Sequence, residues 1–485
     1  MHILFHLFGT LCLGMSNQQN LPNQQQQYSM PQPSYSNQDP SIDPQSGYNT
    51  PQQMQSQPTS TYSFSPQPSQ PSLYQSQDVN QVQQDVEKLN LNRQQSVIED
   101  FHGPYLKFNG VLDNVWYGSV LIVSKTVESL VLFDGQSSII QPLVFHTFKD
   151  FKFQRFSFSV PLQVARRVTY QIQNHPETWN ISVPAANEPL RVLWHSCNGY
   201  SSGVDEKLYP FDGLWNHALK QHTEKPYHCQ MGGGDQLYAD KVFDEAPSLV
   251  TWIKIVSKRK RETHEWTEEM NTQVDDWYFR KYIRHFELPG FKQAVAEIPY
   301  SFVCDDHDLF DGYGSYPDRL QNCPVFQGVF NVAYKYYLLF QQQLTQDMAR
   351  AEGYVGDKGN TFIRHLGQKQ AVLLVDTRKE RSKDTVVTNL SWRKIYDAMD
   401  QMPTSIEHLF LLLPVPIVYP RLKATEKGLA LLSKGINSVG AIRHFTKQFQ
   451  KNGVFTAMIS KFGEPELLDD LCDHWYFFKL TQDSP

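Results

Sequence analysis

The chain has 485 residues, a hydrophobic content of 40% and a formal net charge of −6 at pH 7. This length suffices for two or three domains, and the slightly acidic balance gives no general argument for binding nucleic acid or an anionic membrane surface. The six cysteines show no CxxC spacing and no small disulfide framework, which favours a reducing compartment.

The first hundred residues are expected to contribute no packed core. Residues 1–14 are an apolar leader or a misassigned start. We expect a cytoplasmic protein, whereas a working leader would make it secreted or endomembrane. Residues 15–100 are rich in Gln, Pro, Ser and Asn, so we expect a disordered tail suited to self-association. No other segment is long and apolar enough to span a bilayer.

Residues 101–190 are expected to form a small antiparallel β-sandwich. Apolar side chains alternate with polar ones at Phe156, Phe158 and Val160, which is the period of a half-buried strand. Glycine and proline interrupt the run at short intervals, as in other antiparallel sandwiches. We expect this part to serve packing and spacing.

From residue 191 to 475 the pattern changes to short apolar runs that end in reactive residues, with helical stretches between them. Continuous apolar strands with functional residues at their carboxyl ends indicate a layered α/β catalytic domain. The runs cover residues 192–197, 227–240, 298–308, 371–376 and 408–414. Between them, an aromatic stripe at helical spacing, from Phe326 to Leu344, is expected to be core rather than a cofactor pocket. A basic run at residues 258–261 is an import signal, a phosphate patch or, as we favour, a solvated helix face.

The motif Gly-Asp-x-x-Tyr, with Asp235 and Tyr238, is the first part of a predicted metal site. Three glycines before Asp235 allow a sharp turn, after which the carboxylate can bridge two cations and the phenolate can bind ferric iron. Cys197 ends the preceding run, and its thiolate is a further candidate ligand. Alternatively, Asp235 is a turn residue and Cys197 a small buried apolar side chain.

The second part of the predicted site is the stretch from Asp305 to Asp308. Asp305 and Asp306 offer hard oxygen ligands, and His307 is placed as a general acid for a leaving alkoxide. The alternative is a solvated loop or a helix cap. Arg378 and Arg381 follow a later apolar run and could bind phosphate oxygens or orient the acidic ligands, and structural ion pairing is an equal alternative.

Together these residues predict hydrolysis of phosphoesters at a site of two metal ions. At these positions the sequence looks like the PhoD-like (alkaline phosphatase D) family of metallophosphoesterases in its fungal form. The resemblance covers residues 105–475 and rests on an ordered set of short motifs. They are Ser196-Cys197, Gly234-Asp235-x-x-Tyr238, Asp305-Asp306-His307-Asp308, Asp376-Thr377-Arg378 and residues 467–471.

The resemblance implies a β-sandwich before a four-layer αββα domain, with phosphomonoesterase and phosphodiesterase activity. It also implies a site of iron with calcium or another divalent ion such as magnesium, manganese or zinc. Carried onto this chain, the ligands would be Cys197, Asp235, Tyr238 and one or both of Asp305 and Asp306. His307 would correspond to the histidine of the wider superfamily's Asn-His-Asp/Glu motif. The expected partner is a phosphorylated small molecule or a phospholipid head group.

One departure concerns the second metal ion. Members of the family continue past the segment that matches residues 469–475 into a stretch that supplies histidine ligands, whereas here residues 476–485 read as an aberrant tail. We therefore expect the catalytic domain to lack its C-terminal part. The alternative function is that of an inactive phosphatase-like scaffold or binding protein.

Overall fold

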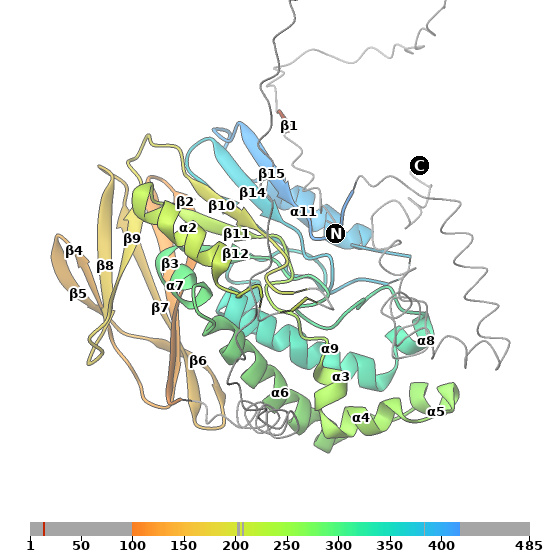
Figure 1. Cartoon of the computed structure of the whole chain (residues 1–485). Coiled ribbons are helices and arrows are strands. Elements are labelled where there is room, and N and C mark those ends of the chain that lie inside the picture. Colours follow the sequence, from red (N-terminus) through yellow and green to blue (C-terminus); the bar gives the residue numbers. More distant parts are fainter. Residues whose placement is uncertain (1–12, 15–98, 201–203, 206–207, 383, 418–485) are drawn as a thin grey trace, which may run out of the picture. The chain divides into compact units, whose positions relative to one another are not determined.

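The computed structural model describes residues 13–14, 99–200, 204–205, 208–382 and 384–417 (Figure 1). The predicted leader, apart from its last two residues, and nearly all of the predicted tail lie outside this part. So do the motif at residues 467–471 and the segment 476–485. Within the described residues the fold is mixed α and β, with strands in three sheets.

The largest sheet combines strands from both halves of the described chain. It has seven strands in the order β10-β11-β12-β2-β3-β7-β6, which we call the large sheet. These strands are β2 (Phe101–Leu112), β3 (Val115–Ser124), β6 (Leu143–Phe148), β7 (Phe151–Pro161), β10 (Val192–His195), β11 (Cys229–Gly232) and β12 (Tyr300–Phe302). The strands β10, β11, β12 and β2 run parallel, and the others pair antiparallel.

A second sheet, the β8 sheet, has the order β5-β4-β8-β9 and is antiparallel. Its strands are β4 (Leu130–Asp134), β5 (Gln136–Ile140), β8 (Arg166–Ile172) and β9 (Thr178–Val183). Strands therefore fill the segment predicted to be β, and on β7 Phe156, Phe158 and Val160 are buried while the serines between them are exposed, as predicted. Because Tyr300 of β12 pairs with Lys107 of β2, strands on both sides of the predicted boundary at residue 190 share one sheet. The division into two domains stays a prediction.

The third sheet, the β15 sheet, has the order β1-β15-β14-β13. Its strands are β1 (Leu13–Gly14), β13 (Phe362–His365), β14 (Gln370–Leu374) and β15 (His408–Leu412). Strand β14 is buried on both faces, because its Val372 and Leu374 join the main core while Ala371 and Leu373 join a second core with Ile395 of α11 (Asn389–Asp400).

Helices cover the sheets (Figure 1). They are α2 (Gly213–Glu224), α3 (Val242–Glu245), α4 (Pro247–Ile253), α5 (Lys258–Glu262), α6 (Glu268–Phe286), α7 (Phe291–Glu297), α8 (Asp318–Gln321), α9 (Pro324–Tyr336), the π-helix η1 (Tyr337–Gln342) and α10 (Gln346–Ala349). The aromatic stripe predicted as core is buried from Phe326 to Leu344. In the described part, no helix is long and apolar enough to cross a membrane.

The basic run at residues 258–261 forms most of α5. Its first three side chains are exposed, as expected for a solvated helix face, whereas Arg261 is buried with its guanidinium over the ring of Trp252. Part of the run is thus a packing element.

Candidate metal centre

The loops that follow β10, β11 and β12 meet at one edge of the large sheet. Parallel strands bring their carboxyl ends to the same edge, so Cys197, Asp235 and Asp305 emerge close together. Backbone hydrogen bonds join the first two loops, since the amides of Cys197 and Asn198 donate to the carbonyls of Gly234 and Asp235 at 3.1 and 2.8 Å. Cys197 and Asp235 both adopt left-handed backbone, with φ of 55° and 53°.

Gly234 is needed where the second and third loops touch. Its φ is 118°, which L side chains rarely adopt, and a Cβ built there would lie 2.5 Å from the Cβ of Asp305. The absence of a side chain at this position therefore lets the Asp305 loop approach the Asp235 loop. This contact gives a physical reason for the last of the three glycines in the predicted cradle.

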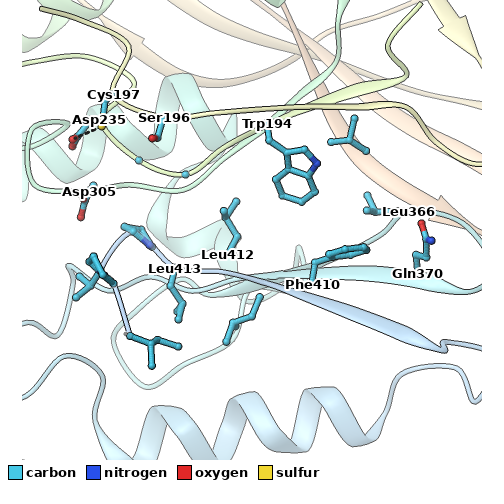
Figure 2. Close-up of a pocket in the computed structure, with 18 of the residues that line it drawn as sticks. Trp194, Ser196, Cys197, Asp235, Asp305, Leu366, Gln370, Phe410, Leu412 and Leu413 are labelled. Atoms are coloured by element: carbon cyan, nitrogen blue, oxygen red, sulfur yellow. Dashed lines mark hydrogen bonds between the residues drawn. The ribbon is translucent and has the colours of Figure 1, made fainter. Parts of the chain in front are cut away.

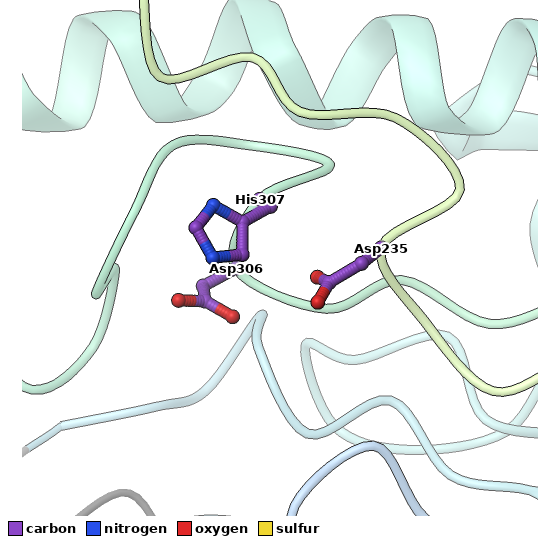
Figure 3. Close-up of side chains that lie close together, drawn as sticks. All are labelled: Asp235, Asp306 and His307. Atoms are coloured by element: carbon purple, nitrogen blue, oxygen red, sulfur yellow. The ribbon is translucent and has the colours of Figure 1, made fainter. Parts of the chain in front are cut away.

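Asp235, Asp306 and His307 form a cluster able to hold a metal ion (Figure 3). One potential ligand atom from each lies within 4.8 Å of the other two. The Oδ1 atom of Asp235 is buried and has no hydrogen-bond partner among the described residues. A buried carboxylate oxygen without a donor is costly unless a cation or water binds it, so the residues present fit a metal ion.

Cys197 and Tyr238 lie beside Asp235. The thiol sulfur of Cys197 is 3.6 Å from Oδ2 of Asp235, and its side chain also interacts with that of Tyr238. The Tyr238 ring is 4.4 Å from the His307 ring, centroid to centroid. Burial, and then the charge of Asp235, raise the pKa of Cys197 to about 12 and raise the pKa of Tyr238 as well. Neither side chain ionises near neutral pH in these surroundings, so ligation by either one needs a cation to displace its proton.

His307 is held by a carboxylate that sequence reasoning did not assign. Its Nδ1 lies 2.8 Å from Oδ1 of Asp240, an oxygen that also accepts from the amide of Asp311 at 2.9 Å. Burial opposes a charge on the ring, but Asp306, Asp235 and Asp240 outweigh it and raise the pKa of His307. With Nδ1 engaged by Asp240, Nε2, which lies 3.9 Å from Oδ1 of Asp311, is the nitrogen that could ligate a cation or donate a proton.

Arg378 is fully buried and directs its guanidinium at protein acceptors. Nε donates to Oδ1 of Asp305 at 2.5 Å, Nη2 to Oδ1 of Asp306 at 3.1 Å, and Nη1 to the carbonyl of Tyr313 at 3.0 Å. Burial would raise the pKa of Asp306, yet Arg378 and His307 together hold it below its usual range. The contacts therefore match the proposed orienting and ion-pairing roles, and phosphate binding by Arg378 stays a prediction.

Arg381 follows Arg378 in the same loop after β14. Its side chain is buried and packs on Gly314, next to the Tyr313 carbonyl that Arg378 uses. Its predicted role in binding substrate stays untested.

Asp308 and Asn198 are two further positioning residues that the sequence did not assign. Asp308 is buried and accepts from the amides of Asp305 and Gln236, both at 2.9 Å, which joins the second and third loops. Asn198 lies 3.1 Å from the ring of His285 in α6 and accepts from the indole of Trp215 in α2 at 2.8 Å. Asp308 belongs to the motif Asp305-Asp306-His307-Asp308, so its place near the site could have been predicted from the sequence. No local sequence pattern indicates the role of Asn198.

The cluster is rich in carboxyl groups. They belong to Asp235, Asp240, Asp305, Asp306, Asp308 and Asp311, and the cationic side chains of Arg378 and His307 pair with several of them. Burial, and then the neighbouring Asp306 and Asp308, raise the pKa of Asp235 despite the opposing charge of His307. An anionic phosphate would be repelled here unless a cation compensated the carboxylates.

Residues 163–442 match the sequence profile of the PhoD related phosphatases. The chain belongs to this family. The match includes every residue predicted for the site, from Cys197 to Arg381, as well as the neighbouring Asp240 and Asp308.

The chain is also similar to one curated protein sequence and to one solved structure. The uncharacterized protein YGR266W of Saccharomyces cerevisiae is 30% identical over 361 residues, which cover 67% of this chain and 50% of that protein. The chain thus spans about half the length of the curated relative it matches. A solved structure described as "Structure of PhoD" aligns with 13% identity over 61% of this chain and 59% of that chain, with a TM-score of 0.39. This likeness is too low to bear on the fold or the site.

Proposed function

We propose that this protein hydrolyses phosphoesters with the help of a metal ion held by Asp235, Asp306 and His307. The observation that carries the proposal is the convergence of these three side chains, with ligand atoms within 4.8 Å, at the carboxyl ends of two neighbouring parallel strands. Membership of a phosphatase family supports the same reaction class. The proposal covers both monoesters and diesters.

Cys197, Tyr238 and Asp305 are proposed as further ligands or close neighbours of the ion. A cation bound there would supply Lewis-acid stabilisation of the phosphoryl oxygens and a nucleophile at neutral pH. Iron with a divalent ion, such as calcium, is the proposed composition. The described residues form one recorded cluster of this kind, so the second ion is proposed from the family resemblance alone.

The protein's own groups have distinct proposed tasks in this reaction. Asp240 holds His307 through Nδ1, which keeps Nε2 in position as ligand or as proton donor to the leaving oxygen. Arg378 bridges Asp305 and Asp306, so that both carboxylates keep a fixed direction while the substrate exchanges. We also propose that the large sheet and the β15 sheet, flanked by helices, form the layered αββα arrangement around the site.

Replacement of Asp235 by asparagine tests the proposal. Because Asp235 has a φ of 53°, asparagine suits the backbone better than alanine and removes only the carboxylate charge. We expect the Asp235→Asn variant of the full chain to lose about a hundredfold or more of the hydrolysis of a chromogenic phosphodiester, together with most of its bound metal. Metal content by mass spectrometry identifies the ion, and a titration with iron and calcium measures its affinity.

The matched control is Asp113→Asn. Asp113 is also an aspartate with left-handed backbone, φ 50°, but it is exposed in the turn between β2 and β3. Activity and metal content should stay within about twofold of wild type. Equal metal content in the two variants would show that Asp235 is not a metal ligand. A wild-type protein that is folded and metal-loaded but hydrolyses no phosphoester would support the alternative of a binding protein.

A further inference from the structure

A cavity of about 490 Å³ opens beside the metal cluster, between β10 of the large sheet and β15 (Figure 2). Its volume falls in the range of small-molecule sites. The walls come from the two facing strands, with Val192 and Trp194 on one side and Phe410 and Leu412 on the other. The rings of Trp194 and Phe410 stand 6.0 Å apart, centroid to centroid. We call it the Trp194 cavity.

One end of the Trp194 cavity is the candidate metal centre. Cys197, Asp235 and Asp305 line it there, together with the backbone of Gly233 and Gly234. Figure 2 shows these side chains at one side of the opening and the apolar side chains extending away from them. A group esterified to a phosphate at Asp235 therefore has this apolar space as an immediate neighbour.

The side chains that line the Trp194 cavity favour an apolar ester substituent over a charged one. Apart from Asp235 and Asp305 at the metal end, its described residues carry no charged side chain. The other polar side-chain groups are those of Ser196, Cys197 and Gln370 and the indole N–H of Trp194. A substituent with further phosphates would meet no lysine or arginine in this lining, whereas an apolar group would contact aliphatic and aromatic side chains. Trp194 keeps 40% of its surface exposed, so an occupant would cover apolar surface that the described chain leaves open.

We propose that the Trp194 cavity binds an apolar alkyl or diacylglyceryl substituent of the phosphoester hydrolysed at the neighbouring cluster. The proposal rests on the proposed function for the reaction, and it adds the class of substrate. The same chemistry occurs in a soluble ester and in a phospholipid.

A series of p-nitrophenyl phosphodiesters tests this with a constant leaving group. The second substituent is methyl, hexyl or diacylglyceryl, the last presented in phosphatidylcholine vesicles. For wild type we expect kcat/KM to be about tenfold or more higher for hexyl than for methyl. A rate for the vesicle substrate above that for hexyl would identify a lipid as the source, and the reverse would identify a soluble ester. A hexyl-to-methyl ratio near one would overturn the proposal.

In Trp194→Ser the ratio of kcat/KM for the hexyl ester to that for the methyl ester should fall to within about threefold of one. In Trp194→Phe most of the wild-type preference for the hexyl ester should remain. Because Trp194 is already partly exposed, neither change should prevent folding. The matched control is Leu214→Ser on α2, an apolar residue with 84% of its surface exposed away from this lining, which should leave the ratio unchanged. An unchanged ratio in Trp194→Ser would also overturn the proposal.

Binding distinguishes a failure of this inference from a failure of the proposed function. Calorimetric titration of metal-loaded wild type with hexylphosphonate and methylphosphonate requires no hydrolysis. Tighter binding of the hexyl compound by about tenfold, lost in Trp194→Ser, would support the cavity even if no ester were hydrolysed. If the methyl ester were hydrolysed but the two phosphonates bound equally well, the proposed function would stand and the proposed role of the Trp194 cavity would be rejected.

Discussion

Two residues of the candidate centre, Cys197 and Asp235, have left-handed backbone although neither is a glycine. Such a conformation costs on the order of 1 kcal/mol or more per residue and persists when the surrounding structure imposes it. Here the two loops impose it on each other through the hydrogen bonds between residues 197–198 and 234–235. The strain is therefore placed at the residues whose side chains point at the proposed ion.

Replacement of Gly199 should affect metal binding at the candidate site more than the stability of the fold. A Cβ at this position would lie 2.3 Å from the Tyr238 ring, and the residue itself is exposed. We expect Gly199→Ala to displace Tyr238, to lower metal affinity by about tenfold or more, and to change the free energy of unfolding by less than about 1 kcal/mol. Metal titration and urea unfolding measure the two effects.

Gly213→Ala is the control for this change. Gly213 begins α2, and a Cβ there would meet no atom within 4 Å. Metal affinity should stay at the wild-type value. If Gly199→Ala also bound metal like wild type, Tyr238 would have to be discarded as a ligand.

For single residues, the sequence predicted the candidate metal ligands better than the residues that hold those ligands in position. Asp235 and Tyr238 share one short motif with the glycines that turn the chain, so their proximity follows from local geometry. Asp240 supports His307 across 67 positions, and Asn198 meets His285 across 87. Pairings of that kind depend on how the strands are ordered in the sheet, which no local pattern specifies.

Among the helices, α6 holds the first loop of the site through a buried histidine. His285 lies in its last turn, 6% exposed, against Asn198 and the rings of Phe211 and Phe291. Burial, and then the nearby Lys281, lower the pKa of His285 to about 3. The folded protein therefore needs this ring neutral.

Stability should fall in mild acid because of this residue. Between pH 6.5 and about 3 the unfolded chain binds a proton that the folded chain does not, so the His285 contribution is complete above pH 6.5 and is lost as the pH falls toward 3. At pH 5 the loss reaches about 2 kcal/mol. Urea unfolding at pH 5 and pH 8 should show a smaller difference for His285→Gln than for wild type.

His217→Gln is the matched control, since His217 is exposed on α2. It should keep the wild-type difference between the two pH values. If His285→Gln kept the full difference as well, other groups would have to account for the acid sensitivity.

The elements themselves were largely predictable. All five apolar runs proposed as strands contain one, because strand-forming apolar residues leave a continuous signal even where, as in β10, the strand is only partly buried. The helical stripe from Phe326 was also predicted, but its end was not. After Tyr336 the chain continues as the π-helix η1 and ends at Gln343 with a φ of 55°, a change that depends on contacts with distant strands rather than on local sequence.

Over the whole described chain, the large sheet joins the β-rich N-terminal strands to the strands that bear the site. The shared edge is short, with Tyr300 of β12 opposite Lys107 of β2, but buried side-chain contacts reinforce it. Lys107 also donates to the Gln342 carbonyl, and Ser301 donates to the carbonyl of Phe108, both at 2.7 Å. These links bind the two halves into one hydrogen-bonded unit.

We therefore expect the two halves to unfold together. Native-state hydrogen exchange should give the most protected amides of β3 and of β11 the same opening free energy, within about 1 kcal/mol. Mass spectrometry of exchange in increasing denaturant measures both in the full chain. Two separate opening energies would show instead that residues 101–190 form an independent domain, as the sequence alone had suggested.

The buried glutamines at the end of η1 restrict which inherited changes the chain can accept. Gln342 donates to the carbonyl of Phe302 and accepts from Tyr354, and Gln343 donates to the carbonyl of Tyr105 and accepts from Ser119. A single base change in a glutamine codon yields Glu, Lys, His, Leu, Pro, Arg or a stop. None of these offers a paired donor and acceptor at the same reach. Natural variants at these two codons should therefore be almost entirely synonymous, however freely glutamines elsewhere in the chain are exchanged.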